Sequence, residues 1–91
     1  MDRREFLRSS GIEIRTLELW IAQRWLVPEA GESGEDFTER EMARASLIRD
    51  LHRDFGVNDE GIDVILHLVD QLHGLRRTLD LLREEMGKTP R

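Results

Sequence analysis

Residues 62–86 read IDVILHLVDQLHGLRRTLDLLREEM, and this stretch decides the fold. Its apolar residues recur at alternating spacings of three and four, which is the period of a helix that pairs with another helix along one stripe. The stripe consists of Ile65, Leu68, Leu72, Leu75, Leu79, Leu82 and Met86. We therefore predict one long helix with a narrow apolar seam.

The two halves of this helix differ in apolar content. Seven of the twelve residues 61–72 are apolar, against five of the fourteen residues 73–86. A helix that is apolar on several sides is buried by its surroundings, whereas a helix with a single seam meets one partner. We predict an N-terminal domain over residues 1–72, followed by a coiled-coil end and a frayed tail over residues 73–91.

The seam in the second half predicts a homodimer. Too little helix lies upstream to cover it, so a second copy of the protein is favoured over a helix folded back on its own chain. The predicted dimerisation residues are Leu72, Leu75, Leu79, Leu82 and Met86.

Composition restricts the classes of function. The 91 residues contain no cysteine, which excludes disulfides and thiolate metal sites. No signal peptide and no apolar run of about 20 residues occurs, so a cytoplasmic protein is expected. The net charge is −5, and residues 29–60 hold four basic and ten acidic side chains. Such an acidic surface opposes nonspecific nucleic-acid binding and favours a basic partner, unless it only keeps the protein soluble.

A helix-turn-helix is predicted near the N-terminus. Arg3–Ser9 has the pattern of a short helix, Ser10-Gly11 breaks it, and a second helix runs from about Ile14 to Arg24. The predicted buried face of the second helix consists of Ile14, Leu17, Ile21 and Trp25. Its opposite face carries Arg15, Glu18, Leu19, Ala22 and Gln23.

A β-hairpin, or wing, and a third helix follow. Leu26-Val27-Pro28 ends the second helix, because the residue before a proline disfavours helical angles. A loop at residues 30–35 between short extended segments predicts the wing. Thr38 with Glu41 forms a capping box that starts the third helix, and Gly56 ends it as a left-handed cap. The predicted buried positions of this helix are Met42, Ala45, Ile48, Leu51 and Phe55.

These motifs together resemble the MerR-type winged helix-turn-helix family. The resemblance covers about residues 3–72 and is carried by Glu5-Phe6, Gly11-Ile12, Arg15-Thr16-Leu17, Leu26-Val27-Pro28, Phe37-Thr38 and Phe55-Gly56-Val57. In that family a DNA-binding head is followed by a helix that dimerises as an antiparallel coiled coil. The implied fold class is all-α with a small β-wing.

Within that family the chain is most similar to the CbpM-like chaperone modulators. The closer likeness rests on Glu5-Phe6, on the stretch from Phe37 to Ile62, and on a chain that stops after a leucine-rich helix. CbpM-like proteins bind the J-domain of the DnaJ-like co-chaperone CbpA and inhibit it. The resemblance therefore implies a non-enzymatic, protein-binding regulator. A MerR-type DNA-binding transcriptional regulator and a coiled-coil adaptor are the alternatives.

The sequence departs from the DNA-binding members of the family at two places. After Arg15-Thr16-Leu17, Glu18 and Leu19 replace the arginine and the aromatic residue that are typical there. The wing reads Gly34-Glu35-Asp36-Phe37, where those members usually offer an arginine to the DNA backbone. Because carboxylates repel phosphates and a leucine cannot hydrogen-bond to a base edge, DNA is not the expected partner.

The resemblance also implies where a J-domain would bind. J-domains present a basic second helix, so an inhibitor needs acidic residues on a rigid element. The candidate partner-binding residues are Glu39, Leu47, Asp50 and Asp54 on the third helix, with Glu35 and Asp36 on the wing as secondary candidates. Nearby arginines at positions 44, 49 and 53 are expected to dilute this charge. The alternative surface is the exposed face of the second helix.

Catalytic, metal and cofactor sites have no candidate in the sequence. His67 and His73 lie six residues apart and so point about 240° apart on a helix, which prevents them from sharing a metal within one chain. The segment 31–34 contains too few glycines and no lysine for a phosphate-binding loop. We therefore predict that the protein is not an enzyme.

Overall fold

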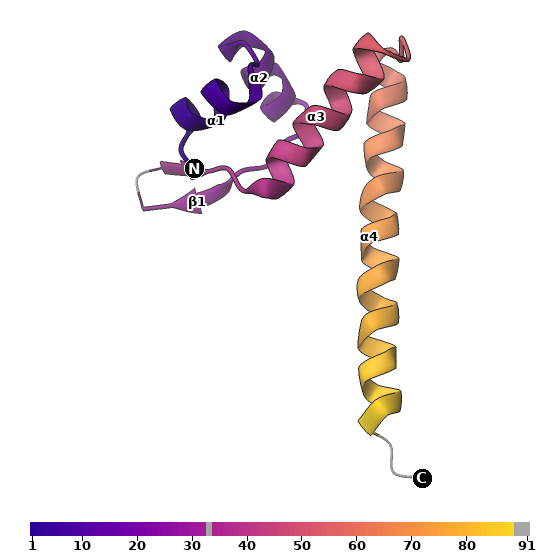
Figure 1. Ribbon diagram of the computed structural model, residues 1–91. Helices are drawn as coiled ribbons and strands as arrows, with labels where there is room; N and C mark the ends of the chain where they lie inside the picture. The colour runs from indigo at the N-terminus through magenta and orange to yellow at the C-terminus, as the bar shows by residue number, and fades with distance from the viewer. Residues whose placement is uncertain (33, 89–91) are drawn as a thin grey trace. The chain divides into compact units, whose positions relative to one another are not determined.

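The computed structural model describes residues 1–32 and 34–88 (Figure 1). The elements in chain order are α1 (Arg3–Ser10), α2 (Ile14–Ala22), β1 (Glu29–Gly31), β2 (Gly34–Asp36), α3 (Glu39–Arg53) and α4 (Asp59–Lys88). The predicted architecture, mostly helical with a β-wing and a long C-terminal helix, is confirmed. The chain divides into two compact units, Met1–Asn58, here called the head, and Asp59–Arg91. The domain boundary predicted at residue 72 stays a prediction.

The helix-turn-helix of the head forms as its capping residues require. Asp2 caps α1, because its Oδ1 accepts a hydrogen bond from the N–H of Glu5 at 2.8 Å. Gly11 takes a left-handed conformation with φ 73°, and its N–H donates to the Leu7 carbonyl at 3.0 Å. Glycine adopts these angles without steric cost, so it ends α1 and turns the chain into α2.

The end of α2 differs from the prediction. The helix stops at Ala22, two residues before the predicted end, in a Schellman turn. In this turn the N–H of Trp25 donates to the Trp20 carbonyl at 2.9 Å, and the N–H of Arg24 donates to the Ile21 carbonyl at 3.0 Å. Arg24 occupies the left-handed position of the turn with φ 63°, where glycine is usual. Since no glycine marks the turn, the sequence contained no signal for it.

The prediction for the buried face of α2 is partly wrong. Leu17 is fully buried as expected, but Ile14 is 52% exposed. Trp20, which only flanked the predicted face, is buried, and Trp25 is buried although it lies beyond the helix. The centroids of the two indole rings lie 6.4 Å apart. The prediction assumed that the helix continued through Trp25. Because Trp25 would then lie on the same side of the helix as Ile14, the predicted buried face was turned towards Ile14 and away from Trp20.

The wing is a two-stranded antiparallel hairpin. Its strands pair Glu29 with Asp36, Ala30 with Glu35, and Gly31 with Gly34. Most of the predicted loop at residues 30–35 therefore belongs to the strands, and Ser33 lies outside the described residues. Directly after β2, the ring of Phe37 is fully buried and stacks on Phe6 of α1, with ring centroids 4.5 Å apart. This stack joins the wing to the helix-turn-helix.

The predicted capping box of α3 and the left-handed conformation of Gly56 are confirmed, but the helix ends earlier than predicted, at Arg53, with Asp54 as its C-cap. The Thr38 N–H donates to Glu41 Oε2 at 3.0 Å, and the Thr38 side chain caps the start of the helix in return. At the other end Gly56 has φ 63°, and the Val57 N–H donates to the Leu51 carbonyl at 2.9 Å.

Among the predicted buried positions of the third helix, the prediction for Phe55 is wrong. Ala45 and Ile48 are buried, and Met42 and Leu51 are half-buried, whereas Phe55 is 75% exposed. The reason is that α3 ends at Arg53. The turn that leads to Gly56 takes Phe55 off the helical repeat on which its burial was predicted.

The second unit consists of α4, a continuous helix of 30 residues. Ile62 and Leu66 in its first turns are buried. Gly87 and Lys88, predicted to begin a frayed tail, are its last helical residues, and residues 89–91 lie outside the described part of the chain.

Within residues 1–32 and 34–88, no helix combines the length and apolar content that crossing a membrane requires.

Candidate functional site

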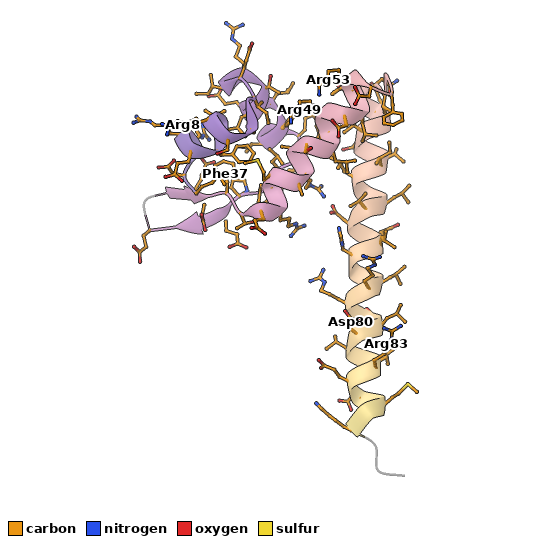
Figure 2. All side chains as sticks on the ribbon, viewed as in Figure 1. Arg8, Phe37, Arg49, Arg53, Asp80 and Arg83 are labelled. Atoms are coloured by element: carbon orange, nitrogen blue, oxygen red, sulfur yellow. The ribbon has the colours of Figure 1, made fainter. Side chains whose placement is uncertain are left out.

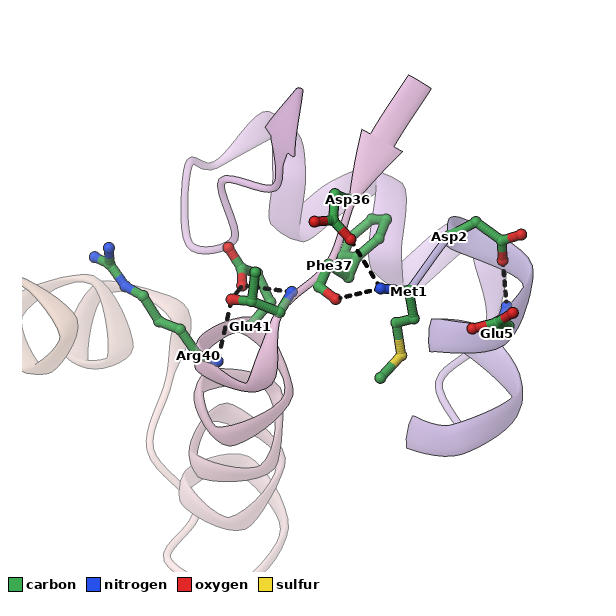
Figure 3. Close-up of polar contacts among 8 residues, drawn as sticks. Met1, Asp2, Glu5, Asp36, Phe37, Arg40 and Glu41 are labelled. Carbon is green, nitrogen blue, oxygen red and sulfur yellow. Dashed lines mark hydrogen bonds and ion pairs between the residues drawn. The ribbon is translucent and has the colours of Figure 1, made fainter. Parts of the chain in front are cut away.

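The wing is tied to the start of the chain by a salt bridge and backbone hydrogen bonds. The Met1 α-amino group donates to Asp36 Oδ1 at 2.8 Å and to the Phe37 carbonyl at 2.9 Å (Figure 3). The Phe37 N–H donates to the Met1 carbonyl at 2.7 Å. The hydrogen bond to Asp36 raises the pKa of the Met1 α-amino group. Asp36, a secondary candidate for partner binding, thus has an intramolecular partner.

Glu35, the other secondary candidate, is also paired within the head. The Arg3 guanidinium donates from Nε to Glu35 Oε1 at 2.8 Å and from Nη2 to Glu35 Oε2 at 3.0 Å. This two-pronged pair raises the pKa of Arg3 and joins α1 to β2. Glu18 of α2 lies 3.9 Å from Arg3 Nη1. Two carboxylates therefore surround Arg3, which leaves it poorly placed to contact a phosphate.

The outward face of α2 is poor in donors for nucleic acid. Arg15, Glu18 and Ala22 are exposed, and Leu19 is 51% exposed. In a helix-turn-helix the corresponding face reads base edges by hydrogen bonding. Only Arg15 offers such donors among these four residues, and Glu18 offsets its charge.

The primary candidates on α3 share one face of the helix. At 3.6 residues per turn, Glu39, Leu47 and Asp50 fall within an arc of about 80°. Asp54, the C-cap residue directly after α3, keeps a right-handed helical conformation and falls within the same arc. Glu39 and Asp54 are exposed, while Leu47 and Asp50 are half-buried. We call these four residues the acidic face of α3.

Of the three arginines expected to dilute this charge, Arg53 lies beside two of these acids. Arg53 approaches Asp50 at 4.0 Å and Asp54 at 3.7 Å. Arg44 donates from Nε to the Trp25 carbonyl at 2.5 Å, and Arg49 donates from Nη1 to the Ser10 carbonyl at 2.5 Å. These two side chains therefore serve the interior of the head (Arg49 and Arg53 are labelled in Figure 2).

The predicted dimerisation residues of α4 are exposed. Leu72, Leu79 and Leu82 are each 53% exposed, Leu75 is 64% exposed and Met86 is 76% exposed. Leu68, which belongs to the same stripe, is 56% exposed. Single exposed leucines are common on protein surfaces, but a contiguous row at coiled-coil spacing indicates an interaction surface.

Sequence reasoning missed Phe55 as a surface residue. Its ring is 75% exposed on the turn between α3 and α4, next to Asp54. Gly56 gave no signal for this, because a left-handed cap at Gly56 is compatible with a helix that continues to Phe55; the helix in fact ends at Arg53. Among the described residues, no group of three or more His, Asp or Glu side chains could hold a metal ion.

With this geometry in place, one comparison identifies the family. A family model described as MerR HTH family regulatory protein matches residues 1–84. The chain belongs to the MerR HTH family of regulatory proteins. This family is not enzymatic, in agreement with the prediction from the sequence. The match spans the helix-turn-helix, the wing, α3 and nearly all of α4. No solved structure matches the chain.

Proposed function

We propose that this member of the MerR HTH family regulates a co-chaperone by binding its J-domain, as the CbpM-like modulators that it resembles do. The protein acts as a homodimer through α4, and each head binds one J-domain. The observation that carries the proposal is the acidic face of α3. It combines three carboxylates with the half-buried Leu47 on a rigid helix.

The acidic face suits a basic helix as its partner. Charges of one sign on a rigid element steer an oppositely charged partner and set its orientation, while an apolar residue among them slows dissociation. Glu39 and Asp54 are exposed, and Leu47 lies between them along the helix axis, next to Asp54 at one edge of the arc. The weak contacts that Arg53 makes with Asp50 and Asp54 can exchange for contacts with a partner, because exposed ion pairs contribute little.

The charge of the head supports a protein partner over DNA. Residues 1–58 hold nine arginines and twelve aspartates and glutamates, a formal charge of −3. Nonspecific DNA affinity depends on cations that replace counterions along the phosphate chain. Here Arg3 is engaged by Glu35, and the outward face of α2 carries Glu18 beside Arg15.

The α4 stripe supports the homodimer. A helix cannot bury a stripe of its own, so Leu72, Leu75, Leu79, Leu82 and Met86 need a second surface. The spacings of three and four suit a second α4 with the same repeat. Antiparallel pairing of the two helices follows from the resemblance to the family.

Binding to a purified J-domain of a DnaJ-like co-chaperone tests the proposal. Surface plasmon resonance with the full chain should give saturable binding. The double variant Asp50→Lys/Asp54→Lys should weaken binding at least tenfold, mainly through the association rate, because it reverses the steering charge. Leu47→Ala should weaken binding mainly through the dissociation rate.

The chain offers a matched control for the charge reversal. Asp80 and Glu84 on α4 have the same spacing as Asp50 and Asp54, and both are exposed. Asp80→Lys/Glu84→Lys changes the net charge by the same amount and should leave J-domain binding within about twofold of wild type. Equal losses in both double variants would indicate a general charge effect and would contradict a site on α3.

DNA binding is the competing function, and the test is direct. In a gel-shift assay at about 50 mM salt, where weak phosphate contacts contribute most, we expect no retained duplex. Tight binding to any duplex together with no binding to the J-domain would overturn the proposal in favour of a transcriptional regulator.

A further inference from the structure

Phe55 differs from every other phenylalanine and tryptophan of the chain in its exposure. The sequence contains three Phe and two Trp residues, and the ring of Phe55 is 75% exposed. The other four rings are buried in the head, at Phe6, Trp20, Trp25 and Phe37. An aromatic ring gains free energy when it leaves water, and protein interfaces are enriched in such rings. Phe55 is therefore the strongest apolar candidate on the surface of the head for contact with a partner.

The turn that carries Phe55 has a fixed backbone. The Val57 N–H donates to the Leu51 carbonyl at 2.9 Å, and both of these side chains are half-buried. Gly56 has φ 63°, an angle that glycine adopts without steric cost. The backbone is thus held on both sides of Phe55. A residue that is held in place before binding loses less conformational entropy when it binds.

The charges beside Phe55 indicate which kind of partner fits it. The side chains of Asp50 and Asp54 are 48% and 58% exposed, and Arg53 lies 4.0 and 3.7 Å from them. Arg53 offsets only one of the two carboxylates. The end of α3 adds partial negative charge, because the last carbonyls of a helix lack donors within the helix. A partner that presents an apolar side chain next to Lys or Arg complements this surface.

Asp54 and Phe55 are close enough to act on the same side chain of a partner. They are consecutive in the chain, so their Cα atoms lie about 3.8 Å apart. A cation that pairs with the carboxylate can also lie over the exposed ring, because the face of an aromatic ring attracts cations. The pair therefore favours a basic partner over a neutral one.

We propose that Phe55 is the main apolar anchor of the partner-binding surface and packs on an apolar side chain that lies next to basic residues of the J-domain. This inference rests on the proposed function and extends the acidic face of α3 by one residue. Leu47 is half-buried and offers only part of its side chain, so Phe55 supplies more apolar area. From Leu47 to Asp54 the surface extends about 10 Å along the helix, a length that one basic helix of a partner can cover.

Surface plasmon resonance with the full chain and a purified J-domain of a DnaJ-like co-chaperone tests the anchor. Phe55→Ala should weaken binding at least about tenfold, because the burial of one ring is lost. The loss should come mainly from faster dissociation, since the substitution leaves the steering charges in place. Phe55→Leu keeps an apolar side chain at the same position and should lose less than Phe55→Ala.

The matched control is Leu19→Ala. Leu19 is a large apolar residue that is 51% exposed on the outward face of α2, which is the alternative surface for a partner. Its substitution should leave J-domain binding within about twofold of wild type, as is usual for residues outside the centre of an interface. A tenfold loss for Leu19→Ala with no loss for Phe55→Ala would overturn the proposal and move the anchor to α2.

Ionic strength separates the contribution of the ring from that of the charges. The fold-loss caused by Phe55→Ala should be equal at about 50 mM and about 500 mM sodium chloride, because salt screens charges and not apolar contacts. The fold-loss caused by Asp50→Lys/Asp54→Lys should shrink at the higher concentration. A loss for Phe55→Ala that disappears at high salt would contradict an apolar anchor.

Sedimentation equilibrium distinguishes the J-domain from a second copy of the chain as the group that covers Phe55. Phe55→Ala should leave the dimer dissociation constant within about twofold of wild type, because the ring lies outside the stripe of α4. A weaker dimer would place Phe55 in the contact between the two copies and would overturn the proposal.

Failure of this inference and failure of the proposed function give different results. If the wild-type chain does not bind the J-domain, the proposed function is wrong, and Phe55 as its anchor is wrong with it. If the wild type binds and Phe55→Ala binds equally well, only the anchor is wrong.

Discussion

The two units of this protein treat their apolar residues in opposite ways. In the head, Phe6, Leu17, Leu26, Phe37 and Ile48 are fully buried. In α4, the stripe from Leu68 to Met86 is more than half exposed at each of its positions. Three short helices and a hairpin cross one another and can enclose a small core, whereas one helix has nothing within itself to pack against. The difference shows that the head supplies its own core, whereas the stripe of α4 remains exposed, as the proposed homodimer requires.

The largest expected effect comes from replacing leucines of the exposed stripe of α4. Leu75→Glu/Leu79→Glu should dissociate the dimer, because each buried leucine contributes about 1.5–3 kcal/mol and four leucines are lost per dimer. The dimer dissociation constant should rise at least about a thousandfold, as measured by sedimentation equilibrium. Leu81→Glu is the control, because Leu81 is 63% exposed but lies off the stripe. A wild-type chain that sediments as a monomer would contradict the dimer.

The next effect concerns the core of the head. Phe37→Ala removes a fully buried ring that stacks on Phe6 at 4.5 Å, so it should lower the free energy of unfolding by about 3–5 kcal/mol in urea titrations. Phe55→Ala, which removes the same atoms from a ring that is 75% exposed, should change it by less than about 0.5 kcal/mol. Similar losses in the two variants would mean that Phe55 is packed.

A smaller effect on the stability of the head is expected from a substitution at the end of α2. Arg24 has φ 63°, and a residue with a side chain pays a steric cost at that angle. Arg24→Gly should therefore raise the free energy of unfolding by about 0.5–1 kcal/mol in thermal or urea unfolding. Gln23→Gly is the control, because Gln23 has an ordinary φ of −77° and should lose stability instead. Equal losses in both variants would contradict a left-handed Arg24.

The smallest effect concerns the link between Met1 and the wing. The hydrogen bond to Asp36 raises the pKa of the Met1 α-amino group above its ordinary 8.0. The folded state therefore holds the proton more tightly than the unfolded state. The stabilisation is fully present below pH 8.0 and is lost as the pH rises through the raised pKa.

Unfolding of wild type and Asp36→Asn between about pH 7 and pH 10 measures this contribution. The wild type should lose more stability than the variant over that range. Parallel curves for the two proteins would show that the salt bridge between Met1 and Asp36 contributes nothing.

Much of the local structure could be predicted because its causes lie a few residues apart. The capping box of Thr38 and Glu41, the left-handed Gly11 and Gly56, and the stripe of α4 all depend on contacts within about one helical turn. Each was predicted and observed. The left-handed turn at Arg24 was not predicted, because nothing in the residue type required it. Because the turn was missed, Ile14 was wrongly predicted to be buried, and Trp20 was placed beside the buried face although it is buried.

The candidate site was only half accessible from the sequence. The carboxylates at positions 39, 50 and 54 follow from spacing along one helix, so their common face could be predicted. The contacts that the neighbouring arginines make could not be predicted. Arg44 and Arg49 were expected to dilute the acidic face, but they donate to backbone carbonyls 19 and 39 residues away in the chain.

The sequence by itself determined the helices, the glycine turn after α1, the capping box of α3, the wing and the apolar stripe of α4, because short-range hydrogen bonds and the helical repeat produce them. The tertiary structure alone decided which charges remain available to a partner. Arg3 meets Glu35 across 32 residues and the Met1 α-amino group meets Asp36 across 35. Such pairs require the packing of Phe6 on Phe37, which holds α1 against the wing. Packing therefore determines the electrostatic surface, and that surface determines which partner the head can bind.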